Sequence, residues 1–191
     1  MESIWIGVDG GGTHSTLAAV REDGTVLGFN KCPGLNFYLT DIATTRERLC
    51  SAVEDLLKKV GANDYRILSV GSAALDGRAD TSQKLNFAGA MFPPQKLELC
   101  GDVFMAQYGA SLGHAGVAVV SGTGAMVLGI DENGYEHFAG GWGYLLGDPG
   151  SAYGISVEAI RAVFAAEEGI GADTGLKTAA LDYLMLRVSG A

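Results

Sequence analysis

The sequence has few of the features that would place it outside the cytoplasm. Its three cysteines, Cys32, Cys50 and Cys100, form no CxxC pair, and their odd number and wide spacing argue against a disulfide framework and against a zinc site. The most apolar stretch, 115–130, is interrupted by glycines and hydroxyl residues, whereas a membrane-spanning helix needs about 20 mainly apolar residues. No basic and apolar leader opens the chain. We therefore expect a soluble, cytoplasmic protein that has no membrane partner.

Basic residues are too few and too scattered for a nucleic-acid surface. The chain has 13 Lys and Arg against 22 Asp and Glu, which gives a formal net charge of −9. Nucleic-acid-binding proteins usually gather their basic residues into a patch, so nucleic acid is not expected as a partner. An anionic small molecule stays compatible with this charge if a metal ion accompanies it. Apolar residues, at 48%, suffice for a packed core.

The order of the predicted elements favours an α/β fold with a mixed sheet. Three strands come first, with an Asp-Gly turn at 22–24 between the second and the third, and helices then alternate with strands. Asp41 and Gly61 are expected at the two ends of the first helix. The expected strands are 4–8, 16–21, 25–29, 67–71, 97–100 and 117–120; the other expected helices are 82–91, 103–112 and 157–166, followed by an amphipathic stretch at 176–187.

The sequence contains an internal repeat. A shift of 110 positions lays Gly12-Thr13 on Gly122-Thr123 and Gly24 on Gly134, with no gap. Both copies read as strand, glycine-rich turn, strand, acidic turn and strand. Matching turns in register indicate a duplicated domain. We therefore expect a first domain over 1–113 and a second that begins at 114 and runs to 191.

Each copy carries a glycine-rich hairpin between two strands. The first hairpin is Asp9-Gly10-Gly11-Gly12-Thr13 and the second is Ser121-Gly122-Thr123-Gly124. Backbone N–H groups without side chains around them can approach an anion closely. Two facing hairpins would clamp a polyphosphate, and Asp9 would hold the accompanying Mg²⁺ through water. The chain has neither GxxxxGK[ST] nor GxGxxG. The alternative is that both are only tight hairpins.

These hairpins, together with the stretch GGWGYLLGDPGSAY at 140–153, resemble the N-acetylglucosamine kinases and the related BadF/BadG/BcrA/BcrD ATPases of the actin-like ATPase superfamily. The resemblance covers residues 4 to about 161. It implies an actin-like, ribonuclease H-like α/β fold with a duplicated domain. In that superfamily the adenosine pocket forms later in the second domain, so we expect an incomplete second domain. We also expect the 191 residues alone to lack appreciable kinase activity and to self-associate through an exposed apolar face.

The resemblance also implies roles for individual residues. Asp9 would orient Mg-ATP, the glycines and threonines of the two hairpins would bind its phosphates, and Asp102 would be the catalytic base. The sugar pocket would use Asn36, Gly141, Trp142 and Asp148. The sequence departs from the family pattern where Gly101 replaces a more common Asn and where Pro149 replaces a usual Glu, which leaves the substrate open.

General chemistry agrees with a carboxylate in the role of Asp102. A sugar hydroxyl is a poor nucleophile, and a carboxylate in line with the γ-phosphate can accept its proton. Each of three residues has a purely structural alternative. Asp102 would only cap the helix that starts at Val103, Asp148 would only shape a turn, and Trp142 would only pack in the core.

We therefore expect an ATP- and Mg²⁺-dependent kinase that phosphorylates a hydroxyl of an amino sugar or hexose, with N-acetylglucosamine or glucosamine as the foremost candidates. A homodimer is left open. One alternative is the ATP-driven activator of a 2-hydroxyacyl-CoA dehydratase; such activators hold an iron–sulfur cluster with a cysteine near the second phosphate loop, and here no cysteine follows Cys100. Another alternative is a non-catalytic sugar-sensing module.

Overall fold

The computed structural model describes residues 3–75, 82, 86–87 and 91–183. It divides into two compact units, Met1–Ala118 with Leu128–His137, and Val119–Val127 with Phe138–Ala191. The expected domain boundary between 113 and 114 stays a prediction.

A five-stranded mixed sheet forms the centre of the first unit, as the sequence predicts. Its strand order is β3-β2-β1-β4-β5; β1 pairs antiparallel with β2 and parallel with β4, and β5 extends the parallel part. The strands are β1 (Ile4–Gly10), β2 (His14–Arg21), β3 (Val26–Pro33), β4 (Ile67–Ser72) and β5 (Leu97–Cys100). β3 runs four residues past its expected end because its pairing with β2 continues to Pro33.

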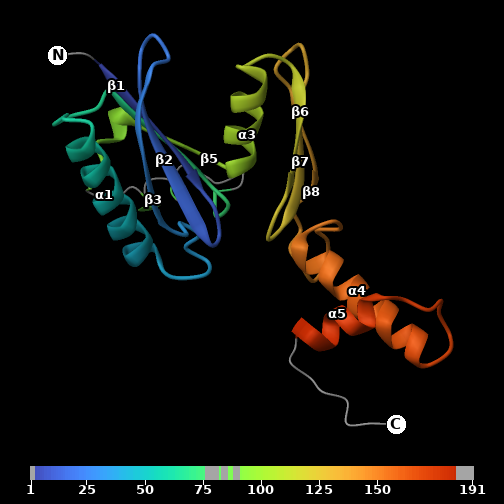
Figure 1. Cartoon of the computed structure of the whole chain (residues 1–191). Helices are drawn as coiled ribbons and strands as arrows, with labels where there is room; N and C mark the ends of the chain where they lie inside the picture. Colours follow the sequence, from blue (N-terminus) through green and yellow to red (C-terminus); the bar gives the residue numbers. More distant parts are fainter. Residues whose placement is uncertain (1–2, 76–81, 83–85, 88–90, 184–191) are drawn as a thin grey trace. The chain divides into compact units, whose positions relative to one another are not determined.

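The two faces of this sheet carry different side chains and different helices. Ile6 and Val8 of β1 are buried in the core that helix α1 (Ile42–Lys59) closes. Because side chains alternate along a strand, Gly7 and Asp9 belong to the other face. Helix α3 (Asp102–Ser111) covers that face, where the Met105 side chain reaches Gly7, so the sheet lies between α1 and α3 (Figure 1).

The ends of α1 follow from its sequence, whereas the start of α3 corrects one expectation. Asp41 accepts a hydrogen bond from the backbone N–H of Thr44 at 2.8 Å, and Gly61 follows the helix with φ +70. In α3 the N-cap is Gly101, and Asp102 is the first helical residue. Asp102 is therefore not the N-cap residue of α3 but stands in its first turn.

The second sheet repeats the arrangement of the first three strands. It has the order β6-β7-β8, with β6 (Gly116–Ser121), β7 (Ala125–Ile130) and β8 (Glu136–Gly140). Moving β1, β2 and β3 by 110 positions gives 114–120, 124–131 and 136–143, which agrees within three residues at every end. The three-stranded arrangement is thus duplicated.

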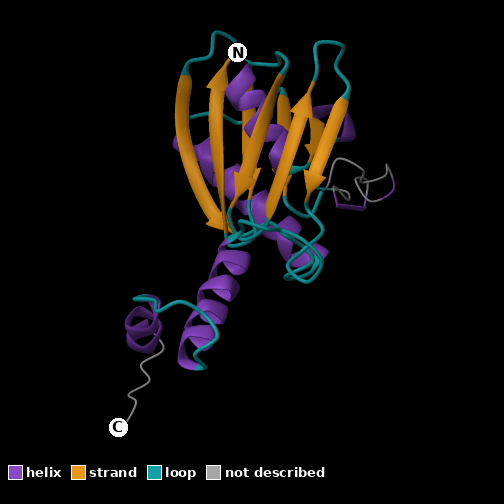
Figure 2. Cartoon of the chain, turned by 90° about the vertical axis from the view of Figure 1, so that its right-hand side faces the viewer, coloured by secondary structure: helices purple, strands orange, loops and turns teal. Residues whose placement is uncertain are grey.

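Helices α4 (Ala152–Glu167) and α5 (Leu176–Tyr183) follow this sheet in the chain and are joined by a loop (Figure 2). Residues of the two helices contact each other. α4 begins five residues before its expected start because Ser151 caps it, accepting from the Gly154 N–H at 3.0 Å. A short helical turn, η1 (Pro94–Lys96), precedes β5. The expected helix at 82–91 lies mostly outside the described residues. Within the described chain, no helix is both long and apolar enough to cross a bilayer.

Candidate functional site

The candidate site of the first unit lies where the three parallel strands end. β1 ends at Gly10, β4 at Ser72 and β5 at Cys100, and because these strands are parallel their carboxyl ends share one edge. In α/β sheets, ligands bind in the crevice outside this edge. The first glycine hairpin follows β1 and Asp102 follows β5. The topology therefore brings together residues that are far apart in the sequence.

Asp9 and Asp102 carry the charge at this edge. Asp9 is exposed at the end of β1, on the face of the sheet that α3 covers. Helix α3 can approach this face closely because residue 71 is glycine. A Cβ at Gly71 would overlap the Met105 side chain and lie 3.4 Å from the Asp102 Cα. Burial raises the pKa of Asp102, and the Asp9 carboxylate raises it further, against the lowering effect of backbone N–H groups. Asp9 and Asp102 therefore lie near each other at this edge of the sheet, since the charge of Asp9 contributes to the raised pKa of Asp102.

The first glycine hairpin needs glycine for space rather than for backbone conformation. A Cβ at Gly10 would lie 2.6 Å from the Gly71 carbonyl oxygen, and one at Gly11 would lie 2.7 Å from the His14 carbonyl oxygen. Neither residue has a positive φ. Gly12 has more room, since the nearest atom to a Cβ there is 3.5 Å away, and Thr13 is exposed. The first two glycines allow close packing, and the last two positions are open to a ligand.

The loop of residues 33–36, here called the Asn36 loop, is fastened to this hairpin. Gly34 N–H donates to the Thr13 carbonyl at 3.0 Å, and Leu35 N–H donates to the Gly11 carbonyl at 3.1 Å. A Cβ at Gly34 would overlap the Gly12 carbonyl oxygen. Asn36 is thereby held beside the proposed phosphate hairpin.

The Asn36 side chain and backbone also bond to the turn that follows. Its Oδ1 accepts the Tyr38 N–H at 2.9 Å, and its carbonyl oxygen accepts from Leu39 N–H at 3.1 Å and from the Thr40 hydroxyl at 3.2 Å. Because the carboxamide oxygen is engaged in this Asx turn, the Nδ2 amide is the end of the side chain left to donate to a ligand.

Sequence reasoning missed the residues that hold the Asn36 loop from the other side. The buried Ser72 hydroxyl donates to the Leu35 carbonyl at 3.0 Å, and Arg48 Nη1 donates to the Gly34 carbonyl at 3.1 Å. A serine after a buried strand and an arginine in a helix have no recognisable motif. Only the tertiary structure shows that they converge on one loop.

In the second unit, the second glycine hairpin is fastened to the start of α4. The backbone N–H of Gly122 donates to the Gly124 carbonyl at 2.9 Å, and Ala152 N–H, in the first turn of α4, donates to the Gly122 carbonyl at 2.8 Å. The Ser121 hydroxyl donates to the Gly150 carbonyl at 2.7 Å. Thr123 is exposed at the tip of this hairpin.

Asp148 connects this hairpin to the turn that contains Gly141. Asp148 is only 7% exposed and has φ +56, a conformation that few residues other than glycine adopt. Its Oδ1 accepts the Gly143 N–H at 3.2 Å, and its Oδ2 lies 2.9 Å from the place of a Cβ at Gly124. Gly141, with φ +75, donates to the Ala125 carbonyl at 2.9 Å. The structure thus brings Gly124, Gly141 and Asp148, three of the expected residues of this unit, together.

Trp142 lies on the surface of the second unit. Its side chain is 68% exposed, so the interpretation of this tryptophan as a core residue is wrong. An exposed indole beside two glycines with positive φ is available to pack against a ligand.

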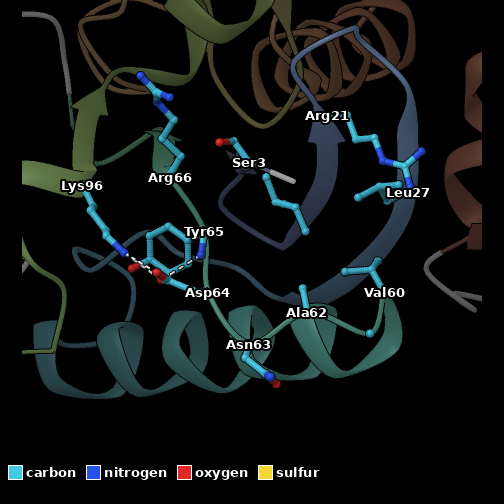
Figure 3. A pocket seen from close by; sticks show the side chains of 12 residues that line it. Ser3, Arg21, Leu27, Val60, Ala62, Asn63, Asp64, Tyr65, Arg66 and Lys96 are labelled. Atoms are coloured by element: carbon cyan, nitrogen blue, oxygen red, sulfur yellow. Dashed lines mark hydrogen bonds and ion pairs between the residues drawn. The ribbon is translucent and has the colours of Figure 1, made fainter. Parts of the chain in front are cut away.

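A cavity of about 820 Å³ lies at the other edge of the first sheet. Arg21, Arg66 and Lys96 line it, and Lys96 Nζ pairs with Asp64 at 2.7 Å (Figure 3). Since β4 begins just after Arg66 and β5 just after Lys96, this cavity adjoins the amino ends of the parallel strands. It is not the candidate site. Among the described residues, no three or more His, Cys, Asp or Glu side chains group as a metal site would require.

Comparison with known proteins gives a consistent result. The BadF/BadG/BcrA/BcrD ATPase family matches residues 6–184. The chain is 28% identical over 196 aligned residues to N-acetyl-D-glucosamine kinase of Dictyostelium discoideum, covering 97% of this chain and 61% of that protein. It is also 28% identical to N-acetylmuramic acid/N-acetylglucosamine kinase of Clostridium acetobutylicum, covering 95% of this chain and 60% of that protein. The chain therefore spans about three fifths of the length of these relatives.

Solved structures show the same fold. A Chromobacterium violaceum protein, provisionally assigned as an N-acetylglucosamine kinase, superposes with a TM-score of 0.76 at 26% identity, covering 95% of this chain and 64% of that one. A ROK family glucokinase from Streptomyces griseus, solved with glucose and AMPPNP, gives 0.60 at 21% identity over 87% of this chain and 63% of that one. The expected actin-like α/β fold is confirmed.

Proposed function

Because the chain belongs to the BadF/BadG/BcrA/BcrD ATPase family, we propose that it carries the sugar- and phosphate-binding parts of an ATP-dependent amino-sugar kinase. N-acetylglucosamine or glucosamine is the proposed substrate. The two similar proteins described above are named as N-acetylglucosamine kinases, and a third, from Vibrio cholerae, is named a glucosamine kinase; it is 26% identical and covers 91% of this chain and 59% of that protein. The observation that carries the proposal is the half-buried carboxyl group of Asp102, with its raised pKa, at the carboxyl edge of the parallel strands.

Asp102 is the proposed general base. It accepts the proton of a sugar hydroxyl while that hydroxyl oxygen forms a bond to the γ-phosphorus of ATP. The bond between the γ-phosphorus and the bridging oxygen breaks, and ADP leaves with that electron pair. A general base is most effective when its pKa approaches the working pH, so the raised pKa of Asp102 suits this role.

The other proposed residues bind and orient. The end of the first hairpin, with half-buried Gly12 and exposed Thr13, offers backbone N–H and hydroxyl donors to phosphate oxygens. Asn36 offers its Nδ2 amide to a sugar hydroxyl. Ser121–Gly124 offers a second phosphate loop, and Gly141, Trp142 and Asp148 offer a surface for the sugar.

A magnesium ion fits the donors of the first unit. Asp9 presents an exposed carboxylate at the end of β1, and Mg²⁺ commonly binds through one or two carboxylates together with water and substrate phosphates. Mg²⁺ supplies neutralisation of the phosphate charge when bound. Asp9 would hold it, through water, beside the hairpin that binds the phosphates.

Isothermal titration with N-acetylglucosamine and glucosamine tests the proposal. We expect one site per chain for at least one of the two sugars, and a loss of tenfold or more in affinity for Asn36→Ala. The matched control is Asn63→Ala, an exposed asparagine at the cavity on the other edge of the sheet, which should bind as the parent does. If neither sugar binds, or if both variants weaken binding equally, the proposal is wrong.

A further inference from the structure

A fully buried hydroxyl lies beneath the Asn36 loop. Ser72 is the last residue of β4 and is 0% exposed. Its Oγ donates to the Leu35 carbonyl oxygen at 3.0 Å and accepts the Ala74 N–H at 3.2 Å. One hydroxyl therefore joins three parts of the candidate site: the end of a central parallel strand, the segment that leaves it, and the loop that carries Asn36.

Gly34 and Leu35, the two residues that precede Asn36, have all their backbone polar groups hydrogen-bonded. Their N–H groups both donate to the glycine hairpin. Their carbonyl oxygens accept from elsewhere, that of Gly34 from Arg48 and that of Leu35 from Ser72. The Leu35 carbonyl lies next to Asn36 in the chain, so the Ser72 hydroxyl is the last fixed point before the Asn36 side chain.

We propose that Ser72 is a positioning residue for the sugar: its hydroxyl fixes the Leu35 carbonyl, and through it the direction of the Asn36 carboxamide. This inference rests on the proposed function, because it assigns Ser72 to the same sugar site. Ser72 itself touches no substrate. Its effect passes through one peptide unit to the side chain that does.

Removing the hydroxyl has a directional consequence. Ser72→Ala leaves the Leu35 carbonyl without its buried donor, and an unsatisfied buried acceptor costs more than the bond itself contributes. The loop can recover by turning this carbonyl away, because the Leu35 side chain in the core keeps the loop attached. Such a turn moves Asn36. The phosphate hairpin is held by other bonds, including the one from Ala73 N–H to the Gly10 carbonyl at 3.0 Å.

The test compares two serines of one strand. Ser69 is also in β4, but its hydroxyl is exposed and lies 3.4 Å from the Glu98 carboxylate, away from the Asn36 loop. We expect Ser72→Ala to lower the affinity for N-acetylglucosamine roughly 5- to 30-fold, the factor that corresponds to a lost buried bond. The affinity for Mg-ATP should change less than threefold. Ser69→Ala should leave both affinities unchanged.

A double-mutant cycle separates positioning from general destabilisation. If Ser72 acts through Asn36, then adding Ser72→Ala to Asn36→Ala should cost almost nothing further in sugar affinity. Additive losses, or an equal loss of sugar and nucleotide binding, would overturn the proposal.

A spectrum of the ligand-free chain distinguishes failure of this inference from failure of the proposed function. The ¹⁵N-correlated signals of the Asn36 side-chain amide and of the Tyr38 N–H should shift in Ser72→Ala and stay in place in Ser69→Ala. If the parent binds no sugar but these signals shift, the proposed function is wrong and the positioning role of Ser72 stands. If the signals do not move, the positioning role is wrong, whatever the chain binds.

Discussion

Gly34→Ala should destabilise the first unit strongly, because the added methyl group has no room. A Cβ at position 34 would overlap the Gly12 carbonyl oxygen and lie 2.6 Å from the Gly12 carbonyl carbon. These are backbone atoms of the proposed phosphate hairpin, so relief requires the hairpin and the Asn36 loop to separate. Separation would stretch the two hydrogen bonds that Gly34 and Leu35 donate to the hairpin.

The size of the effect follows from these two terms. Overpacking typically costs about 1–3 kcal/mol, and each stretched hydrogen bond costs about 0.5–1.5 kcal/mol. We therefore expect a loss of roughly 2–6 kcal/mol in the free energy of unfolding. At about 3–6 °C per kcal/mol for a unit of this size, the unfolding temperature should fall by some 6–36 °C.

Calorimetry against a matched glycine tests this reasoning. Gly109 lies inside α3, where a Cβ would meet no atom of another segment within 4 Å, and it has no positive φ. Gly109→Ala should therefore stabilise the protein by about 0.5–1 kcal/mol. Opposite shifts from one chemical change are the expected result. A Gly34→Ala protein that unfolds within about 1 °C of the parent would show that the loop and the hairpin do not pack as described.

Three further predictions concern charge, nucleotide binding and association. Asp102→Asn should lower the rate of any phosphoryl transfer from ATP to the sugar by a factor of about 10²–10⁴. Its affinity for the sugar should stay within tenfold of that of the parent. It should also raise the unfolding temperature at pH 7: because the pKa of Asp102 is raised in the folded state, stability is lost as pH rises from about 3.8 through the folded pKa. Thermal scans from pH 3 to 8 should show this gain vanish in acid, and a constant gain would contradict the assignment. A Cβ at Gly122 would meet no atom within 4 Å, so we expect Gly122→Val to fold and to lose Mg-ATP affinity in calorimetric titration because its side chain blocks a phosphate position; unchanged affinity would show that this loop is only a hairpin. Phe164, 61% exposed on α4, should support self-association, so Phe164→Glu should shift light scattering toward the monomer, and identical scattering of both proteins would exclude this face.

The sequence predicts the strands and the duplication well because their signals are local. The alternation of Ile4, Ile6 and Val8, and the glycine turns at two matching positions, depend on neighbouring residues alone. The apolar pattern predicts too late a start for α4 because Ser151 and Gly154 at its first turn interrupt that pattern, although Ser151 is its cap. The same pattern predicts too short a β3 because Asn30 and Lys31, in the second half of this strand, are polar. β3 is an edge strand of the sheet, so these side chains need not be buried.

The candidate site could be predicted only where one residue type carries the chemistry. Asp9, Asp102 and the glycine hairpins have recognisable patterns. Ser72 and Gly71 do not, because their roles come from segments that meet only after folding: a loop more than thirty residues earlier for Ser72, and α3 for Gly71. Trp142 shows the reverse error, since a large aromatic residue is usually buried and here it is exposed.

The central claim is that an amino sugar binds at the carboxyl edge of the parallel strands. A ¹H–¹⁵N correlation spectrum recorded during titration with N-acetylglucosamine tests this most directly, because the two edges of the sheet carry separate reporters. The account predicts that shifts concentrate on the Asn36 side chain, Gly101 and Asp102. Shifts confined to Asn63 and Arg66 at the opposite cavity, or an unchanged spectrum at saturating sugar, would contradict it.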